Sequence, residues 1–405
     1  MGARISKALE ISTFLSWSLA LILLLTGSRP GRGSEVRVER RTSSSPKTQN
    51  QTLTESGPQA SDDPQLKTVL DRMAAAGITR PSSVADVRRA YLFYPKLSGT
   101  PEHVFHIEDR QIPGPLGNIT VRVYTPNRTS GLPILVFFHG GGFVAGNLDT
   151  HDNPLRSVTN RCECIVVSVD YRLAPENKYP AAPEDAYSAT KWVAEHAGDI
   201  SGDPRRIAVG GDGAGGNLAA VVTLMARERG TPSLVFQILI YPMLDASTMR
   251  PSWFTESDAP TVTRESKHKL LSTYLPIAAN LGDSFISPIR AQNFKNLPPA
   301  LLMTYGGHDP MRIEGEEYIR RLKEDGVVAR VSLYPQSIHG FFLMAGELDA
   351  GKKCIDEVAA TLRNAFNSML TGSSVKSVPR YTQKISLQSP LSLPDQPHHA
   401  TVQVM

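Results

Sequence analysis

One glycine-rich turn has the setting of a catalytic nucleophile but lacks the nucleophile. The segment Gly-Gly-Asp-Gly-Ala-Gly-Gly at 210–216 follows a predicted strand and precedes a predicted helix. A strand, a sharp turn and a helix are the setting of the nucleophile elbow, whose pattern is Gly-x-Ser-x-Gly. Here the frame is Gly211-x-Gly213-x-Gly215, so Gly213 stands where the serine would be. Glycine has no side chain, and no acyl-enzyme can form on it.

The same turn also matches a phosphate-binding pattern. Gly211, Gly213 and Gly216 fit G-x-G-x-x-G. A dinucleotide fingerprint, however, opens the first strand–helix unit of a fold and has an acid about 20 residues later. This turn comes in the middle of the fold, after another glycine loop, so the nucleotide interpretation is disfavoured. Asp212 precedes the apex of the turn and is expected to point away from it, so it does not replace the nucleophile.

An acid and a histidine follow two later strands. Asp309 lies in Gly-Gly-His-Asp-Pro-Met-Arg and His339 in Ser-Ile-His-Gly-Phe, each just past a predicted strand. Nucleophile, acid and histidine in this chain order are typical of the α/β-hydrolase triad. There the acid orients the imidazole, which takes the proton of the nucleophile. A single histidine before Gly-Phe would more often be structural, but together with the other loops these positions predict a triad-type role.

A third loop could hold negative charge. His-Gly-Gly-Gly-Phe at 139–143 follows the apolar run 134–138. Consecutive glycines let backbone N–H groups approach a ligand without interference from Cβ atoms. Such donors can stabilise an oxyanion in a dry site. The alternative is a glycine-rich turn that only connects a strand to a helix.

The elements that must position these loops alternate along the chain. Apolar runs that predict strands are separated by segments of helical spacing, which predicts an α/β fold with a mostly parallel sheet covered on both faces. The segment 245–283 interrupts this alternation and is a candidate lid, which would join the N-terminal helices over the carboxyl edge of the sheet. Its apolar and aromatic residues suggest an apolar pocket; they are Trp253, Phe254, Tyr274, Leu275 and Pro276. The predicted strands are 119–124, 134–138, 164–169, 207–210, 236–241, 300–305 and 329–334, and the helices 64–76, 182–196, 217–228 and 314–324.

The ends of the chain have a different character from its centre. The basic residues Arg4 and Lys7 precede an apolar run at 11–25. This pattern predicts that residues 1–28 are a signal peptide, or an uncleaved membrane anchor as the second choice. Export, periplasmic or secreted, is therefore expected. Residues 29–62 are polar and predict a flexible linker, and 371–405 a disordered tail. The compact domain is thus expected at 63–370, and an exposed edge strand near its carboxyl end could pair two copies in a homodimer.

The charge and cysteine content of the chain limit the kinds of partner and cross-link that we expect. The formal net charge of the 405 residues is only +4, with acidic and basic residues interspersed, so nucleic acid is not an expected partner. Cys162, Cys164 and Cys354 are too few for a disulfide framework, and we expect them to be small apolar residues without a redox role.

Five motifs taken together resemble the hormone-sensitive-lipase-like esterases of the bacterial carboxylesterase group. They are His-Gly-Gly-Gly, Asp-Tyr-Arg-Leu-Ala-Pro-Glu at 170–176, Gly-Asp-x-Ala-Gly-Gly, Asp-Pro-Met-Arg and His-Gly-Phe, in the family's order over about 63–370. The resemblance implies an eight-stranded sheet flanked by helices, a helical cap, no metal or organic cofactor, and short- to medium-chain ester substrates. It also implies an oxyanion hole from the N–H groups of Gly141, Gly142 and Ala214, Asp309 as acid, His339 as base, and Gly213 at the nucleophile position.

The glycine leaves three hypotheses open. In the first, the protein is a catalytically inactive hydrolase-like protein that binds a small apolar ester or ester-like ligand beneath its cap. In the second, His339 activates a water in the space of the missing hydroxymethyl group, for direct hydrolysis or lyase chemistry. In the third, the glycine is a variant or an error one codon base from serine, and the protein is an ordinary exported esterase.

Overall fold

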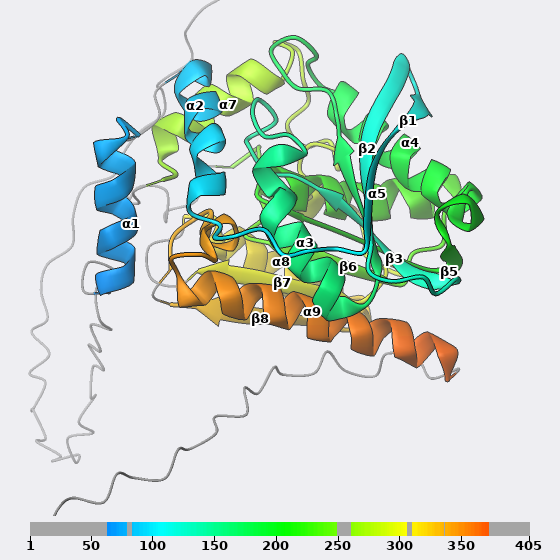
Figure 1. The fold of residues 1–405 in the computed structure, drawn as a ribbon. Helices are drawn as coiled ribbons and strands as arrows, with labels where there is room; N and C mark the ends of the chain where they lie inside the picture. Colours follow the sequence, from blue (N-terminus) through cyan, green and yellow to red (C-terminus); the bar gives the residue numbers. More distant parts are fainter. Residues whose placement is uncertain (1–62, 79–82, 249–260, 306–309, 336, 372–405) are drawn as a thin grey trace, which may run out of the picture. The chain divides into compact units, whose positions relative to one another are not determined.

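A single eight-stranded sheet forms the centre of the fold. A computed structural model describes residues 63–78, 83–248, 261–305, 310–335 and 337–371. The strand order is β1-β2-β4-β3-β5-β6-β7-β8 (Figure 1); β2 pairs antiparallel with β1 and β4, and all other neighbours are parallel. The strands are β1 (His106–Gly114), β2 (Gly117–Thr125), β3 (Leu132–Phe138), β4 (Ile165–Asp170), β5 (Gly202–Asp212), β6 (Phe236–Ile240), β7 (Ala300–Tyr305) and β8 (Ala329–Tyr334).

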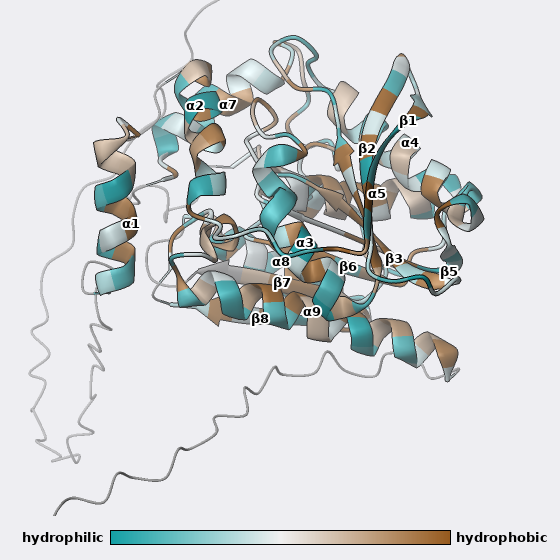
Figure 2. Ribbon diagram, viewed as in Figure 1, coloured by the Kyte–Doolittle hydropathy of each residue, from teal (hydrophilic) through white to brown (hydrophobic). Residues whose placement is uncertain are grey.

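The central strands are apolar on both sides because both faces of the sheet are covered. Every residue of β3 is buried. Since successive side chains of a strand point to opposite faces, Val136 and Phe138 enter one hydrophobic core while Leu135 and Phe137 enter the other. Figure 2 shows the hydrophobic residues concentrated in these central strands, whereas the outer helices carry hydrophilic residues as well.

Helices cover the two faces of the sheet in separate sets. Helices α4, α5 and α8 contribute to the core that includes Val136, and α3 and α9 to the core that includes Leu135. The helices are α1 (Pro64–Ala75), α2 (Val84–Phe93), α3 (Asp152–Cys162), α4 (Ala181–Glu195), α5 (Ala214–Arg229), α7 (Arg264–Tyr274), α8 (Arg312–Glu324) and α9 (Asp349–Leu370), with short 3₁₀ turns η2 (Tyr94–Lys96), η3 (Asp149–His151), η4 (Ala197–Ile200), η5 (Pro288–Arg290) and η6 (Phe341–Met344).

Helices α1, α2 and α7 make up the cap. They lie together on one side of the molecule in Figure 1, and α2 and α7 both contribute side chains to the pocket described below. The mostly parallel eight-stranded sheet, its flanking helices and the cap confirm the fold class predicted from the sequence. The structure adds β1, α2, α3, α7 and α9, which the apolar runs did not predict. Within the described ranges, no helix is long and apolar enough to cross a membrane.

The expectation for two of the cysteines was wrong. Cys162, at the end of α3, and Cys164, just before β4, form a disulfide. Only one residue separates them, and the turn from helix to strand brings their Cα atoms to 5.3 Å, which is within the range that a disulfide requires. Cys354 is a buried thiol, as expected of a small apolar residue.

Candidate active site

Gly213 lies at the apex of a sharp turn between β5 and α5. Its φ of 54° and ψ of −113° form a backbone conformation that residues with a Cβ rarely adopt. The turn is fixed by backbone hydrogen bonds: Gly213 N donates to Ile240 O at 2.9 Å, and Met243 N donates to Gly213 O at 3.3 Å. The helix also approaches β3 closely, since a Cβ on Gly215 would lie 1.9 Å from Phe138 O. The turn therefore has the geometry of a nucleophile elbow without the nucleophile.

His339 faces the position that a side chain of residue 213 would occupy. An ideal Cβ built on Gly213 lies 3.3 Å from His339 Nε2 and 3.7 Å from Cε1. The imidazole packs against Tyr241, with ring centroids 4.5 Å apart, and Thr261 Oγ1 donates to the carbonyl of His339 at 3.2 Å. Burial lowers the pKa of His339 to about 4, although the carboxylate of Asp212 opposes this shift. The ring is therefore neutral at pH 7, which is the form a general base needs.

The predicted acid, Asp309, lies outside the described residues. The described part of β7 ends at Tyr305 and the chain is described again from Pro310. Its role as the residue that orients His339 therefore stays a prediction. Trp253 and Phe254, two of the residues expected to line an apolar pocket, also lie outside the described ranges.

The loop after β3 presents backbone N–H groups beside the elbow. Gly141 has a φ of 124°, and a Cβ there would lie 2.0 Å from Ala145 O, so only glycine fits. As far as the structure describes the chain, the N–H groups of Gly141, Gly142 and Ala214 donate to no other residue. All three residues line the same pocket as Gly213 and His339. The loop can thus offer several N–H donors to one oxygen atom of a ligand.

A buried polar network that sequence reasoning missed connects this loop to the elbow. Asp212 Oδ1 accepts from Gly140 N at 2.8 Å and lies 2.9 Å from His151 Nε2. Burial alone would raise the pKa of Asp212, but the electrostatic interaction with His151 and the hydrogen bonds from His151 and Gly140 lower it on balance. The carboxylate of Asp212 thus binds Gly140 and His151 and does not line the pocket, in agreement with the prediction that it points away from the apex. Nothing in the sequence near His151 indicates this pairing, because 61 positions separate the two residues.

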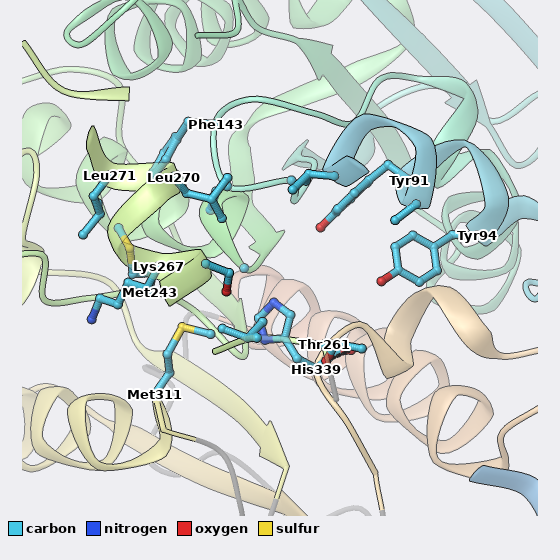
Figure 3. Close-up of a pocket in the computed structure, with 18 residues that line it drawn as sticks. Tyr91, Tyr94, Phe143, Met243, Thr261, Lys267, Leu270, Leu271, Met311 and His339 are labelled. Carbon is cyan, nitrogen blue, oxygen red and sulfur yellow. Dashed lines mark hydrogen bonds between the residues drawn. The ribbon is translucent and has the colours of Figure 1, made fainter. Parts of the chain in front are cut away.

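The glycines and His339 form the floor of a pocket of about 100 Å³ beneath the cap. Figure 3 shows His339 at its centre, with Tyr91 and Tyr94 on one side and the α7 residues Lys267, Leu270 and Leu271 on the other. Of the residues expected to line it, Tyr274 is instead buried in the hydrophobic core of the domain and stacks on Phe143 with centroids 3.9 Å apart. The apolar part of the wall consists of Val87, Ala90, Phe143, Ala214, Met243, Val262, Leu270, Leu271 and Met311.

A buried ion pair attaches the cap helix α7 to the body of the domain. Lys267 Nζ donates to Asp245 O at 2.8 Å and lies 3.4 Å from Glu314 Oε2, with both side chains at most 4% exposed. Glu314 Oε1 also accepts from Leu244 N at 3.0 Å. Burial raises the pKa of Glu314, and the charge of Lys267 partly offsets that rise. The Lys267 stem lines the pocket while its ammonium group is bound behind the wall.

No cluster of three or more histidine, cysteine, aspartate or glutamate side chains able to hold a metal ion occurs among the residues whose structure is described. The groups gathered at the pocket are instead those of acyl chemistry: a neutral imidazole, backbone N–H donors and an apolar wall. This arrangement can bind an ester and stabilise the charge that develops on its carbonyl oxygen when a nucleophile attacks.

Comparisons with known proteins agree with this geometry. The family described as alpha/beta hydrolase fold matches residues 135–343. The carboxylesterase NlhH of Mycobacterium tuberculosis is 38% identical over 314 residues, covering 76% of this chain and 97% of the relative. An arylesterase of Saccharolobus solfataricus is 31% identical over 270 residues, covering 64% of this chain and 81% of the relative. The solved structure of a hyperthermophilic esterase from Pyrobaculum calidifontis is 40% identical, with a TM-score of 0.70, covering 75% of this chain and 98% of that one. The chain therefore belongs to the α/β-hydrolase fold family, in its hormone-sensitive-lipase-like carboxylesterase group.

Proposed function

We propose that this protein hydrolyses small apolar esters by direct attack of water, without an acyl-enzyme. The observation that carries the proposal is the 3.3 Å between His339 Nε2 and the position of a Cβ on Gly213. In an ordinary esterase the serine hydroxyl lies in this region, between the imidazole and the ester carbonyl. Because Gly213 has no side chain, a water can occupy that region and hydrogen-bond to Nε2.

The reaction then needs one tetrahedral intermediate. The ester carbonyl oxygen accepts hydrogen bonds from the N–H groups of Gly141, Gly142 and Ala214. The water oxygen forms a bond to the carbonyl carbon while its proton passes to His339 Nε2. When the intermediate collapses, the C–O bond to the alcohol breaks and the alcohol oxygen takes the proton back from the imidazolium. The products are the acid and the alcohol, and Asp309 is expected to orient the imidazole.

The test is hydrolysis of p-nitrophenyl acetate and butyrate by the full chain, beside His339→Ala and His103→Ala. The second variant is a matched control for the imidazole, because His103 is exposed and does not line the pocket. Imidazole hydrolyses activated esters anywhere on a surface, so only a loss specific to His339→Ala supports the proposal. Mass spectrometry of quenched reactions should find no acylated protein. A burst of p-nitrophenol with a covalent adduct would contradict it.

A second candidate is ligand binding without turnover. The observation that favours it is the burial of His339, which lowers the pKa of its imidazole to about 4, because a base of such low pKa removes a proton from water slowly. On this hypothesis the natural protein binds esters and does not cleave them, whereas Gly213→Ser cleaves them. This candidate is eliminated if the natural protein hydrolyses p-nitrophenyl butyrate and His339→Ala abolishes that activity.

We also propose that the protein is exported or anchored by its N-terminal segment. The basic and apolar character of residues 1–28 supports export, and so does the Cys162–Cys164 disulfide, since disulfides persist mainly in oxidising compartments. The test is fractionation of the source cells with sequencing of the mature N-terminus. A mature chain that begins near residue 29 supports a cleaved signal peptide, and an intact, membrane-bound chain supports an anchor.

We further propose that the protein forms a homodimer through its edge strand β8. Among the described residues it is the last strand of the sheet, and Leu333 is 47% exposed. An unpaired strand edge with an exposed apolar side chain is a site at which a second sheet can add. Light scattering on the full chain beside Leu333→Lys tests this. A monomeric natural protein contradicts it.

A further inference from the structure

Apart from His339, the polar side chains that line the pocket fall into two groups. Thr261, Ser266 and Lys267 use their polar atoms to hold the cap together. Thr261 donates to the carbonyl of His339, Ser266 Oγ donates to Thr263 O at 2.8 Å, and Lys267 binds Asp245 O and Glu314. These groups are occupied by the protein and are not available to a ligand without breaking the cap.

The second group consists of two phenols. Among the residues that the structure describes, neither Tyr91 Oη nor Tyr94 Oη has a hydrogen-bond partner, yet Tyr94 is only 6% exposed. Figure 3 shows both hydroxyl groups pointing into the pocket toward His339. Tyr94 Oη lies 3.4 Å from a Cβ built on Gly340, the residue after His339. The phenols are thus next to the reacting region.

Both rings are held in place by other aromatic groups. They meet edge to face with centroids 5.1 Å apart, and Tyr91 stacks on His151 at 6.3 Å. Burial is the largest cause that raises the pKa of both phenols, so each stays protonated and offers an O–H donor. Rigid donors lose little conformational entropy when a ligand binds them.

We infer that Tyr91 and Tyr94 form a second polar subsite, which binds a neutral acceptor oxygen of the ligand in addition to the ester carbonyl. The favoured ligands are therefore esters that carry an ether or ketone oxygen in the acyl or alcohol part, rather than purely alkyl esters. An ionised carboxylate is disfavoured because the surrounding wall is apolar and the ammonium group of Lys267 is bound to Glu314 behind it. This inference rests on the proposed binding of esters in the pocket, but not on their turnover.

Matched ligands that differ by one oxygen test the subsite. Methoxyethyl acetate is butyl acetate with one methylene replaced by oxygen, and ethyl methoxypropanoate is related in the same way to ethyl pentanoate. We would measure Kd for each by ligand-observed NMR on the full chain and on Tyr91→Phe and Tyr94→Phe. Tyr187→Phe is the control, because its hydroxyl donates to Thr231 O and lies outside the pocket.

The natural chain should prefer the ether of at least one pair. Tyr91→Phe or Tyr94→Phe should reduce that preference by roughly 3- to 10-fold, the range of one neutral hydrogen bond, while Tyr187→Phe leaves it unchanged. An unchanged preference in both variants overturns the subsite even if the protein hydrolyses esters. If the protein does not hydrolyse esters but still prefers the ether ligand through its phenols, the result supports the subsite and contradicts only the proposed hydrolysis. If no ester of either pair binds, both proposals are wrong.

Discussion

Gly213→Ser should convert the site into an ordinary esterase. The ideal Cβ of residue 213 lies 3.3 Å from His339 Nε2, so the hydroxyl one bond beyond it can reach about 2.6–3.2 Å from that nitrogen by rotation of the side chain. The contact is slightly tight, and the imidazole must move by a few tenths of an ångström. Loss of the serine from a protease triad costs about 10⁶-fold in turnover, so the gain should lie between about 10³- and 10⁶-fold. The assay is kcat/KM for p-nitrophenyl butyrate, with a covalent acyl adduct detected by mass spectrometry.

The same substitution should cost stability. A residue with a Cβ at φ 54° and ψ −113° stores about 1–3 kcal/mol of backbone strain that glycine avoids. Gly213→Ala is the matched control, because it carries the same strain and no nucleophile. The two variants should therefore lose the same free energy of unfolding, while only the serine gains activity, and His339→Ala should remove that gain. A serine variant as stable as the alanine variant but equally inert would refute the placement of His339 as its base.

Three other perturbations test the site and its supports. Burial lowers the pKa of His339 from the usual 6.5 of a histidine to about 4, so the pH profile of kcat/KM should be flat above about pH 5 and fall below it. Between these two pKa values the unfolded state binds the proton more readily than the folded state, so folding stability should also rise with pH across this window, as denaturation at stepped pH will show. Asp212→Ala should destabilise the fold by about 3–5 kcal/mol because Gly140 N and His151 lose a buried carboxylate, and Asp212→Asn should cost less because one oxygen remains, which urea unfolding measures. Lys267→Met should lower the free energy of unfolding by about 3–5 kcal/mol at neutral pH, and by less at acidic pH, where Glu314 takes up a proton. Adding Glu314→Gln should recover most of this loss. A double variant no more stable than Lys267→Met would argue against an uncompensated carboxylate as the cause.

The sequence predicted the parts of the fold whose signal is local. Buried parallel strands are continuous apolar runs, so β3 and β4 were visible directly, and the motifs at their ends could be placed at one edge of the sheet. The edge strand β1 was not visible, because most of its residues are at least partly exposed and it shows no apolar alternation. Helix α9 could have been found: Ile355, Val358, Leu362 and Phe366 recur at helical spacing and are all buried.

The parts of the site that the sequence did not predict depend on pairs far apart in the chain. Lys267 and Glu314 are 47 positions apart, and a lysine in a polar helix is normally expected to face solvent. The phenols of Tyr91 in α2 and Tyr94 in η2 reach the pocket through the tertiary fold, and no local pattern indicates that placement. Even Cys162 and Cys164, which are nearly adjacent, become a bonded pair only through the turn from α3 to β4.

The site does not depend on a side chain at residue 213 for its shape. The elbow is held by the backbone of Gly213 through Ile240 and Met243, and the loop after β3 is held by Asp212 through Gly140. Loss of the serine hydroxymethyl group therefore removes one reactant and leaves the binding groups in position. It follows that restoring the serine requires no rebuilding of the pocket, so the activity of Gly213→Ser reports directly on whether His339 and the backbone donors are arranged for catalysis.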